Sequence, residues 1–337
     1  MRNKSLLAAV VVIAATALTG AAAPNQEHSQ DLKIFGSRTV THVGVVVRDV
    51  EKAAKAWADL FQVEVSPVTD AKAVAFPKGY RGDRGAHTRV AKVHFNNMLV
   101  ELEQPVGGAS PWKDFLDKYG EGIHHIGFNV AGLEDHVRLL ESKGGKRVLG
   151  ETGGSVALVD LMPQLGLTIE LTKAQAAPPF GTPGPPATKG MKDPARIGLM
   201  VRDGDAFKAR YIDLFDVPVN PAVESKGRTL QFPKDFTGDP QASNREIYVP
   251  LDNFWVNLIQ PVGGKSPWRD LLDKREGGHY FNFNVDDVEE GTARLVQKGG
   301  HRILGNEKAA YAYVDMPSLG VTILLLQNKP PTPPAAK

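Results

Sequence analysis

Four side chains of the kinds that bind divalent metals stand at matching places in two halves of the segment 38–173. His42 and His125 each begin a strand-like apolar stretch, and Glu101 and Glu170 each lie in the strand that closes its half. If the halves pair about a pseudo-twofold axis, all four side chains reach one concave surface. Two imidazoles and two carboxylates suit an octahedral ion with two positions open to water or substrate. The pattern predicts one divalent ion here, namely zinc, nickel, cobalt, manganese or iron.

A second copy of this segment serves as an internal control. The stretch from Gln104 to Lys118 recurs 156 residues later, and similar offsets hold along the chain. At these offsets the four residues are replaced by Arg196, Asn257, Tyr280 and Leu324. Because the neighbouring apolar and turn residues are kept, the fold does not need the four ligands. That favours a functional role for them in the first copy, and it predicts that the second copy binds no metal there.

The elements that must position the ligands repeat within each copy. The strand at His42 is followed by a helical stretch to Phe61, in which apolar residues recur at helical spacing. The strand at His125 is followed by a helical stretch from Leu133 to Lys143, which a pair of glycines ends. Short apolar runs that indicate strands come after each helix. The pattern predicts a strand, a helix and three strands, twice in each copy.

Composition sets the limits of the two copies. We expect the metal-binding copy at residues 38–173 and the copy without ligands at 195–327. Residues 174–194 contain the run PPFGTPGPP, and proline at this density indicates a semi-extended linker. Residues 328–337 contain four prolines and indicate a disordered tail.

Residues 1–23 have the composition of a secretory signal peptide. Arg2 and Lys4 precede an apolar run from Leu6 to Leu18, which is short for a membrane span, and three alanines follow. A retained N-terminal anchor is the competing interpretation. No later stretch is apolar enough to cross a membrane. We therefore expect a protein of the periplasm or the extracellular space, with no membrane contact after signal cleavage.

The composition also limits the partners. The 337 residues are 42% hydrophobic and 23% charged, as in chains that bury a packed core. Because 40 basic and 38 acidic residues are intermixed, no nucleic acid is expected, and the expected partner is a small-molecule substrate. The chain has no cysteine, so a metal must take histidine nitrogen and carboxylate oxygen. The paired copies could take the place of a homodimer, which makes a monomer the expected state.

With these motifs the first copy resembles the vicinal oxygen chelate superfamily, which includes glyoxalase I, methylmalonyl-CoA epimerase, extradiol dioxygenases and bleomycin-resistance proteins. The start HVGVVV at His42 and the stretch SPWKDFLDKYGEGIHHIGFNV from Ser110 look most like the epimerase branch. The resemblance implies an α+β fold of two tandem domains. Each would contain two βαβββ modules that form a curved mixed sheet around a concave metal and substrate cup. The metal positions of the family fall on His42, Glu101, His125 and Glu170.

Two details of the motifs refine the ligand set. Of the neighbours His124 and His125, the resemblance selects His125, because His125 aligns with His42 before the same apolar pattern. His124 is assigned to the pocket or to packing, since its counterpart His279 survives in the second copy. Epimerases often have glutamine at the position of Glu101, so a glutamate here favours metal binding of the glyoxalase type.

The chain departs from the epimerases at their proton-transfer base. The epimerases carry a second glutamate upstream of the Glu101 position, whereas residues 82–87 read GDRGAH here. Asp83 or His87 could substitute for it. Asp83 has a counterpart in Asp239 of the second copy, which favours a turn residue.

In the family the substrate binds the metal through two vicinal oxygens, and the metal stabilises an enolate as a Lewis acid. Our first hypothesis is an exported metal-dependent epimerase, isomerase or lyase that acts on a small α-oxygenated carbonyl compound. Glu170 or Glu101 would move the α-proton. Because acyl-CoA thioesters are not expected outside the cytoplasm, the signal peptide argues against methylmalonyl-CoA itself.

Two other functions stay open. An iron(II) extradiol-type dioxygenase needs two histidines and one carboxylate, although such enzymes usually keep the complete set in the C-terminal copy. A non-catalytic protein that sequesters a small molecule is the third hypothesis. A cup lined by Tyr280, Trp255 and Arg196 in the second copy could hold an aromatic or anionic molecule. Otherwise the second copy is a structural brace for the first.

Overall fold

The computed structural model describes the two copies and little outside them. The described residues are 38–71, 75–173, 191–219, 223–224, 232–233, 237–239, 241–305 and 309–328. The expected signal peptide at 1–23 lies outside them, as do residues 174–190 of the expected linker and 329–337 of the expected tail. Within the described residues, no helix is long and apolar enough to cross a membrane.

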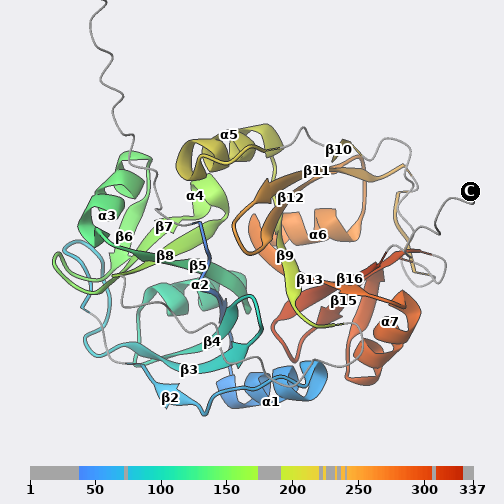
Figure 1. Ribbon diagram of the computed structural model, residues 1–337, viewed down its shortest axis with the longest axis horizontal. Helices are drawn as coiled ribbons and strands as arrows, with labels where there is room; N and C mark the ends of the chain where they lie inside the picture. Colours follow the sequence, from blue (N-terminus) through green and yellow to red (C-terminus); the bar gives the residue numbers. More distant parts are fainter. Residues whose placement is uncertain are drawn as a thin grey trace, which may run out of the picture. The chain divides into compact units, whose positions relative to one another are not determined.

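The first copy forms one mixed sheet of eight strands (Figure 1). Its first module is β1 (His42–Val46), α1 (Val50–Phe61), β2 (Thr69–Asp70), β3 (His87–His94) and β4 (Leu99–Val106). Its second module is β5 (Gly122–Val130), α3 (Leu133–Ser142), β6 (Lys146–Leu149), β7 (Val156–Leu161) and β8 (Leu167–Lys173), with the short helix α4 (Met162–Leu165) before β8. The strand order is β2-β3-β4-β1-β5-β8-β7-β6.

The second copy repeats this arrangement in a second sheet, in the order β10-β11-β12-β9-β13-β16-β15-β14. Its first module is β9 (Pro194–Met200), α5 (Gly204–Phe215), β10 (Val223–Glu224), β11 (Ser243–Pro250) and β12 (Trp255–Val262). Its second module is β13 (Gly277–Val285), α7 (Val288–Gln297), β14 (His301–Leu304), β15 (Tyr311–Met316) and β16 (Val321–Gln327). The expected α+β fold of two tandem copies, each with two βαβββ modules, is confirmed.

A helix that the sequence analysis did not predict joins the modules of each copy. Helix α2 (Pro111–Tyr119) begins after Ser110, whose side chain accepts a hydrogen bond from the backbone N–H of Lys113. Helix α6 (Pro267–Lys274) begins after Ser266 in the same way. A serine N-cap followed by proline in the first turn is a strong start signal, because proline loses no hydrogen bond there. The repeated Ser-Pro pair was therefore the signal for both helices.

The two modules of the first copy meet at the centre of its sheet. Strand β1 pairs antiparallel to β5, and each runs parallel to the closing strand of its own module. Alternate side chains of a strand face opposite sides of the sheet. One side faces the hydrophobic core and includes Val43, Leu102, Ile126 and Ile169. We call the opposite side the cup face, and it carries the neighbours of these residues, His42, Glu101, His125 and Glu170.

The two copies share one hydrophobic core. Trp57 of α1 packs edge-on against Phe281, with 5.6 Å between ring centroids, and its indole N–H donates to the carbonyl of Leu319 at 3.3 Å. The reciprocal bond runs from the hydroxyl of Tyr211 in α5 to the carbonyl of Leu165 at 3.0 Å. Trp57 and Tyr211 are equivalent in the repeat, as are Leu165 and Leu319. The copies therefore associate as a pseudo-symmetric pair.

Candidate metal centre

His42, His125 and Glu170 lie together on the cup face. The Nε2 atoms of His42 and His125 are 3.1 Å apart. The carboxylate oxygens of Glu170 lie 3.7 Å from Nε2 of His42 and 3.6 Å from Nε2 of His125. Two nitrogens bound to one ion at about 2.1 Å, at a right angle, are themselves about 3 Å apart. The spacing of the two imidazoles therefore fits a divalent ion that Glu170 also binds.

Glycines on the facing strands make room for the histidine rings. His42 lies opposite Gly127, and His125 lies opposite Gly44. A Cβ atom on Gly44 would lie 2.0 Å from the His125 ring, and one on Gly127 would lie 2.0 Å from the His42 ring. Each strand thus supplies a histidine and, two residues later, a glycine that admits the ring of the other strand. The repeated His-x-Gly spacing was a sequence signal for this contact.

Glu101 also faces the cup, but it is held by a lysine. Its Oε1 atom lies 2.7 Å from Nζ of Lys92, which is opposite Glu101 on β3. Among the described residues, the ligand atoms of His42, His125 and Glu170 lie within 4.8 Å of one another, and that group does not include Glu101. A metal ion would compete with the Lys92 ammonium for this carboxylate. The role of Glu101 as the fourth ligand stays a prediction.

Burial and neighbouring charges set the ionisation of the site. Burial raises the pKa of Glu170 above its ordinary value and lowers the pKa of His125 well below its own. Burial also acts to raise the pKa of Glu101, but the charges of His42 and Lys92 outweigh it and the pKa of Glu101 is lowered. A neutral imidazole and an ionised carboxylate are the forms that bind metals. His125 and Glu101 therefore hold these forms at neutral pH.

Neither residue considered as a replacement for the epimerase base lies at the metal site. The carboxylate of Asp83 accepts a hydrogen bond from the backbone N–H of Ala109 at 2.8 Å, and Asp239 accepts one in the same way in the second copy. These aspartates hold turns. His87 belongs to β3 but is an odd number of residues from Lys92, so it points to the opposite side of the sheet. Its ring lies 2.8 Å from a backbone carbonyl.

The first copy is similar in sequence to proteins of a known family. A family model described as the glyoxalase, bleomycin resistance protein and dioxygenase superfamily matches residues 41–157. The ethylmalonyl-CoA/methylmalonyl-CoA epimerase of Cereibacter sphaeroides is 34% identical over 113 residues, which are 33% of this chain and 74% of that protein. The chain belongs to this superfamily, the vicinal oxygen chelate proteins.

Two further relatives extend the likeness. The mitochondrial methylmalonyl-CoA epimerase of Mus musculus is 27% identical over 157 residues, which are 45% of this chain and 82% of that protein. A variant of 4-hydroxymandelate synthase from Streptomyces coelicolor matches in structure with a TM-score of 0.59 and 14% identity. That match covers 88% of this chain and 94% of the other, so the vicinal oxygen chelate fold extends over both copies.

Two buried polar residues behind His125 were not assigned as neighbours of the metal from the sequence. Nδ1 of His125 lies 3.5 Å from Oε2 of Glu103 and 3.1 Å from Nδ1 of His124. Burial, and then the charges of Glu170 and Glu101, raise the pKa of Glu103 well above its ordinary value. Burial lowers the pKa of His124 to about 3. The alternation along LVELEQ was the signal that Glu103 shares the cup face with Glu101.

In the second vicinal oxygen chelate domain, a hydrogen-bonded network occupies the corresponding place. Arg196 donates from Nε to the side-chain oxygen of Asn282 at 2.7 Å. The amide of Asn257 donates to the hydroxyl of Tyr280 at 2.9 Å and to the carboxylate of Glu246 at 3.2 Å. The aromatic ring of Tyr280 therefore stands where the first domain has the ring of His125, and protein groups satisfy its hydroxyl.

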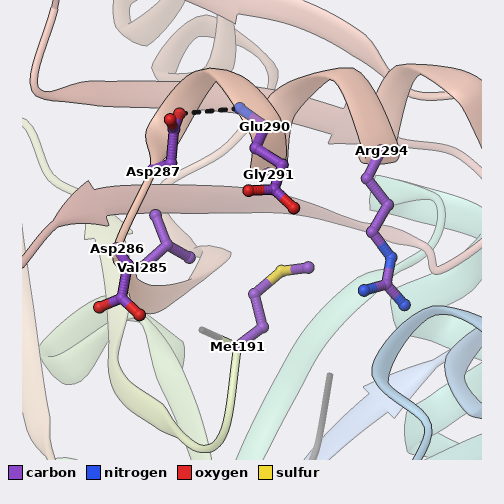
Figure 2. A pocket seen from close by; sticks show the side chains of 7 residues that line it. All are labelled: Met191, Val285, Asp286, Asp287, Glu290, Gly291 and Arg294. Atoms are coloured by element: carbon purple, nitrogen blue, oxygen red, sulfur yellow. Dashed lines mark hydrogen bonds between the residues drawn. The ribbon is translucent and has the colours of Figure 1, made fainter. Parts of the chain in front are cut away.

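The second domain also has a cavity of about 420 Å³ (Figure 2). Its polar lining consists of Asp286, Asp287, Glu290 and Arg294. The carboxylate of Asp287 accepts from the backbone N–H of Glu290 at 2.9 Å and caps α7, while Arg294 donates to the carbonyl of Leu60 at 2.7 Å. Asp287 thus stabilises a helix and Arg294 the contact between the copies, and none of the lining residues is a predicted ligand.

Proposed function

We propose that the protein is an exported metal-dependent isomerase or lyase of the glyoxalase or epimerase type. Its substrate in this proposal is a small carbonyl compound with an oxygen on the α-carbon. The observation that carries the proposal is the group of His42, His125 and Glu170, whose donor atoms converge in the first domain. The family model matches residues 41–157 of that domain. The names of the two epimerase relatives support proton transfer as the reaction class.

The first domain supplies the groups that such a reaction needs. A divalent ion held by His42, His125 and Glu170 would supply Lewis acidity toward a carbonyl oxygen of the substrate. Glu170 is oriented by Thr172, whose hydroxyl donates to its Oε1 at 3.3 Å. Because burial raises its pKa, Glu170 is suited to take the α-proton and return it.

The proposed location narrows the substrate. Residues 1–23 have the composition of a signal peptide, and acyl-CoA thioesters are not expected outside the cytoplasm. The proposed substrate is therefore a small hydroxy or oxo acid, and not a CoA ester. In this proposal the second domain braces the first, which is supported by the shared core around Trp57 and by the complete burial of Tyr280.

Elemental analysis of the purified full chain tests the metal site. We expect one divalent ion per chain in the wild type, and its loss in His42→Ala and Glu170→Ala. Arg196→Ala changes the residue equivalent to His42 in the second domain and serves as the matched control, which should retain the metal. Absence of metal from the wild type after exposure to excess metal would contradict the proposal.

The reaction itself is tested by solvent exchange. A panel of small 2-hydroxy and 2-oxo acids is incubated with the protein in deuterium oxide. Exchange of the C2 proton of the hydroxy acids and of the C3 protons of the oxo acids is followed by NMR. Chelation of the metal should abolish the exchange, and added metal should restore it. Full exchange after verified removal of the metal would rule out the proposed mechanism.

An iron(II) dioxygenase is the second candidate, and one observation favours it. The donor atoms that converge come from two histidines and one carboxylate, which is the donor set of non-haem iron(II) oxygenases. Glu101, the fourth predicted ligand, is paired with Lys92. Oxygen uptake by the iron(II)-loaded protein on catechols, without proton exchange on the acid panel, would establish this function instead.

A further inference from the structure

Glu103 is a buried residue whose carboxyl group has an unsatisfied oxygen atom. It is 4% exposed, and in the described part of the chain its Oε2 atom has no hydrogen-bond partner. The same atom lies 3.5 Å from Nδ1 of His125. Because leaving a buried polar atom without a partner costs stability, a carboxyl group retained at such a place calls for an explanation.

The geometry of His125 explains why a carboxyl group is kept at this place. Its Nε2 atom faces His42 and Glu170, so a metal ion would take the lone pair of Nε2. In a neutral imidazole the proton is then on Nδ1, which becomes a hydrogen-bond donor. Two acceptors are in place for it, Oε2 of Glu103 at 3.5 Å and Nδ1 of His124 at 3.1 Å.

The second domain distinguishes these two acceptors. His124 is kept there as His279, although no metal ligand follows it, and the ring of His279 bonds to a backbone carbonyl at 3.1 Å. Glu103 is replaced by Ile259, in the same copy in which His125 is replaced by Tyr280. The histidine is therefore compatible with a domain that lacks the ligands, whereas the glutamate is absent together with them.

We propose that Glu103 is a positioning residue of the metal centre. Its carboxylate accepts the Nδ1–H hydrogen bond of His125 and thereby holds Nε2 toward the ion. A carboxylate in this place fixes the tautomer and orientation of the ring and increases the basicity of the ligand nitrogen. The inference rests on the proposed function, because it needs a metal ion at His42, His125 and Glu170.

Cobalt(II) binding to the full chain tests the inference. The metal-free wild type is compared with Glu103→Ile, which installs the residue of the second domain, and with Glu103→Gln, which keeps an acceptor oxygen. The matched control is Glu246→Gln, a carboxylate of the second domain that accepts hydrogen bonds from Tyr248 and Asn257. Affinity is measured by competition with a chelator, the ligand field by visible absorption, and the stability of the metal-free protein by urea unfolding.

We expect Glu103→Ile to bind cobalt(II) about 10- to 100-fold more weakly and with a changed visible spectrum. Its metal-free form should be as stable as the wild type or more stable, because a buried polar group has been replaced by an apolar side chain. Glu103→Gln should lose less affinity. Glu246→Gln should keep the affinity and spectrum of the wild type.

Two results would overturn the inference, and they differ in what else they overturn. If the wild type binds cobalt(II), His42→Ala does not, and the Glu103 variants bind like the wild type, the inference alone fails. If the wild type does not bind cobalt(II), or if His42→Ala binds it equally, the proposed metal site fails together with the inference. A Glu103→Ile variant that is less stable without metal but unchanged in affinity would show a purely structural residue.

Discussion

At the scale of single residues, the chain keeps several titratable groups buried on its cup faces and between its copies. His279 is 8% exposed, and its ring bonds to the backbone carbonyl of Arg275. Burial, and then the charge of Arg275, lower the pKa of His279 well below its ordinary value of 6.5. The folded protein therefore binds fewer protons at this residue than the unfolded chain does. Folding is linked to pH through this difference.

The sign of this linkage predicts a stability loss in acid. Above pH 6.5, His279 does not reduce the free energy of unfolding. Below that value the unfolded chain binds a proton at this residue, and the free energy of unfolding decreases by at most about 1.4 kcal/mol per pH unit. The substitution His279→Leu removes the contribution of this residue to the pH dependence of the free energy of unfolding. Between pH 7.5 and pH 5, the variant should therefore gain up to about 2 kcal/mol relative to the wild type.

Urea unfolding of the metal-free proteins at the two pH values measures this gain. His301→Gln, which removes an exposed histidine of β14, is the control for the loss of a histidine as such. Parallel pH profiles for wild type and His279→Leu would show that the buried ring is not the source of the acid sensitivity.

At the scale of elements, the pairing of β1 with β5 decides whether the two imidazoles meet. The contact depends on a register in which each histidine faces a glycine of the other strand. A shift of one residue in this pairing would place the two histidines on opposite sides of the sheet. The second copy keeps the same strand pairing, but it has Asn282 opposite Arg196 and Gly198 opposite Tyr280. The strand pairing is thus common to both copies. A facing pair of imidazoles needs a glycine opposite each ring, and only the first copy has both glycines.

Gly44→Ala should therefore damage the metal site directly. The new Cβ would lie 2.0 Å from the ring of His125, so the ring must move and the metal affinity should fall at least about tenfold. Overpacking of this kind also costs about 1–3 kcal/mol of stability. Gly198→Ala is the matched control, because its Cβ would lie 1.7 Å from the ring of Tyr280.

Both glycine variants should lose comparable stability in urea, but only Gly44→Ala should lose metal in a chelator competition. Equal metal affinities in the two variants would mean that the position of the His125 ring does not control binding.

At the scale of the whole molecule, we expect the two copies to unfold as one cooperative unit. The rings of Phe61 and Phe283, one from each copy, stack with 4.6 Å between centroids, and Trp57 packs against Phe281 beside them. These apolar groups would be exposed to water if the copies separated. The second copy therefore stabilises the first without ligands of its own. That the full chain is a monomer stays a prediction, which light scattering would test.

Calorimetry of the full chain tests the cooperativity. We expect a single unfolding transition for the metal-free wild type. Trp57→Ala removes a fully buried side chain from the shared core and should shift this whole transition, with a loss of about 3–5 kcal/mol. Tyr211→Ala, at the equivalent position of the second copy, should have an effect of the same kind. Two separate transitions, of which each variant moves only one, would show that the copies fold independently.

The sequence by itself determined the duplication, the four modules and the positions of the predicted ligands. Repeat offsets and the alternation of apolar residues are properties of the chain, and they establish which residues share a face of a strand. Only the tertiary structure decided which of these side chains meet. His42, His125 and Glu170 converge, whereas Glu101 is paired with Lys92 and Glu103 stands behind His125. The reason is physical: distances across a sheet depend on strand order and register, and these are set by the packing of the whole core.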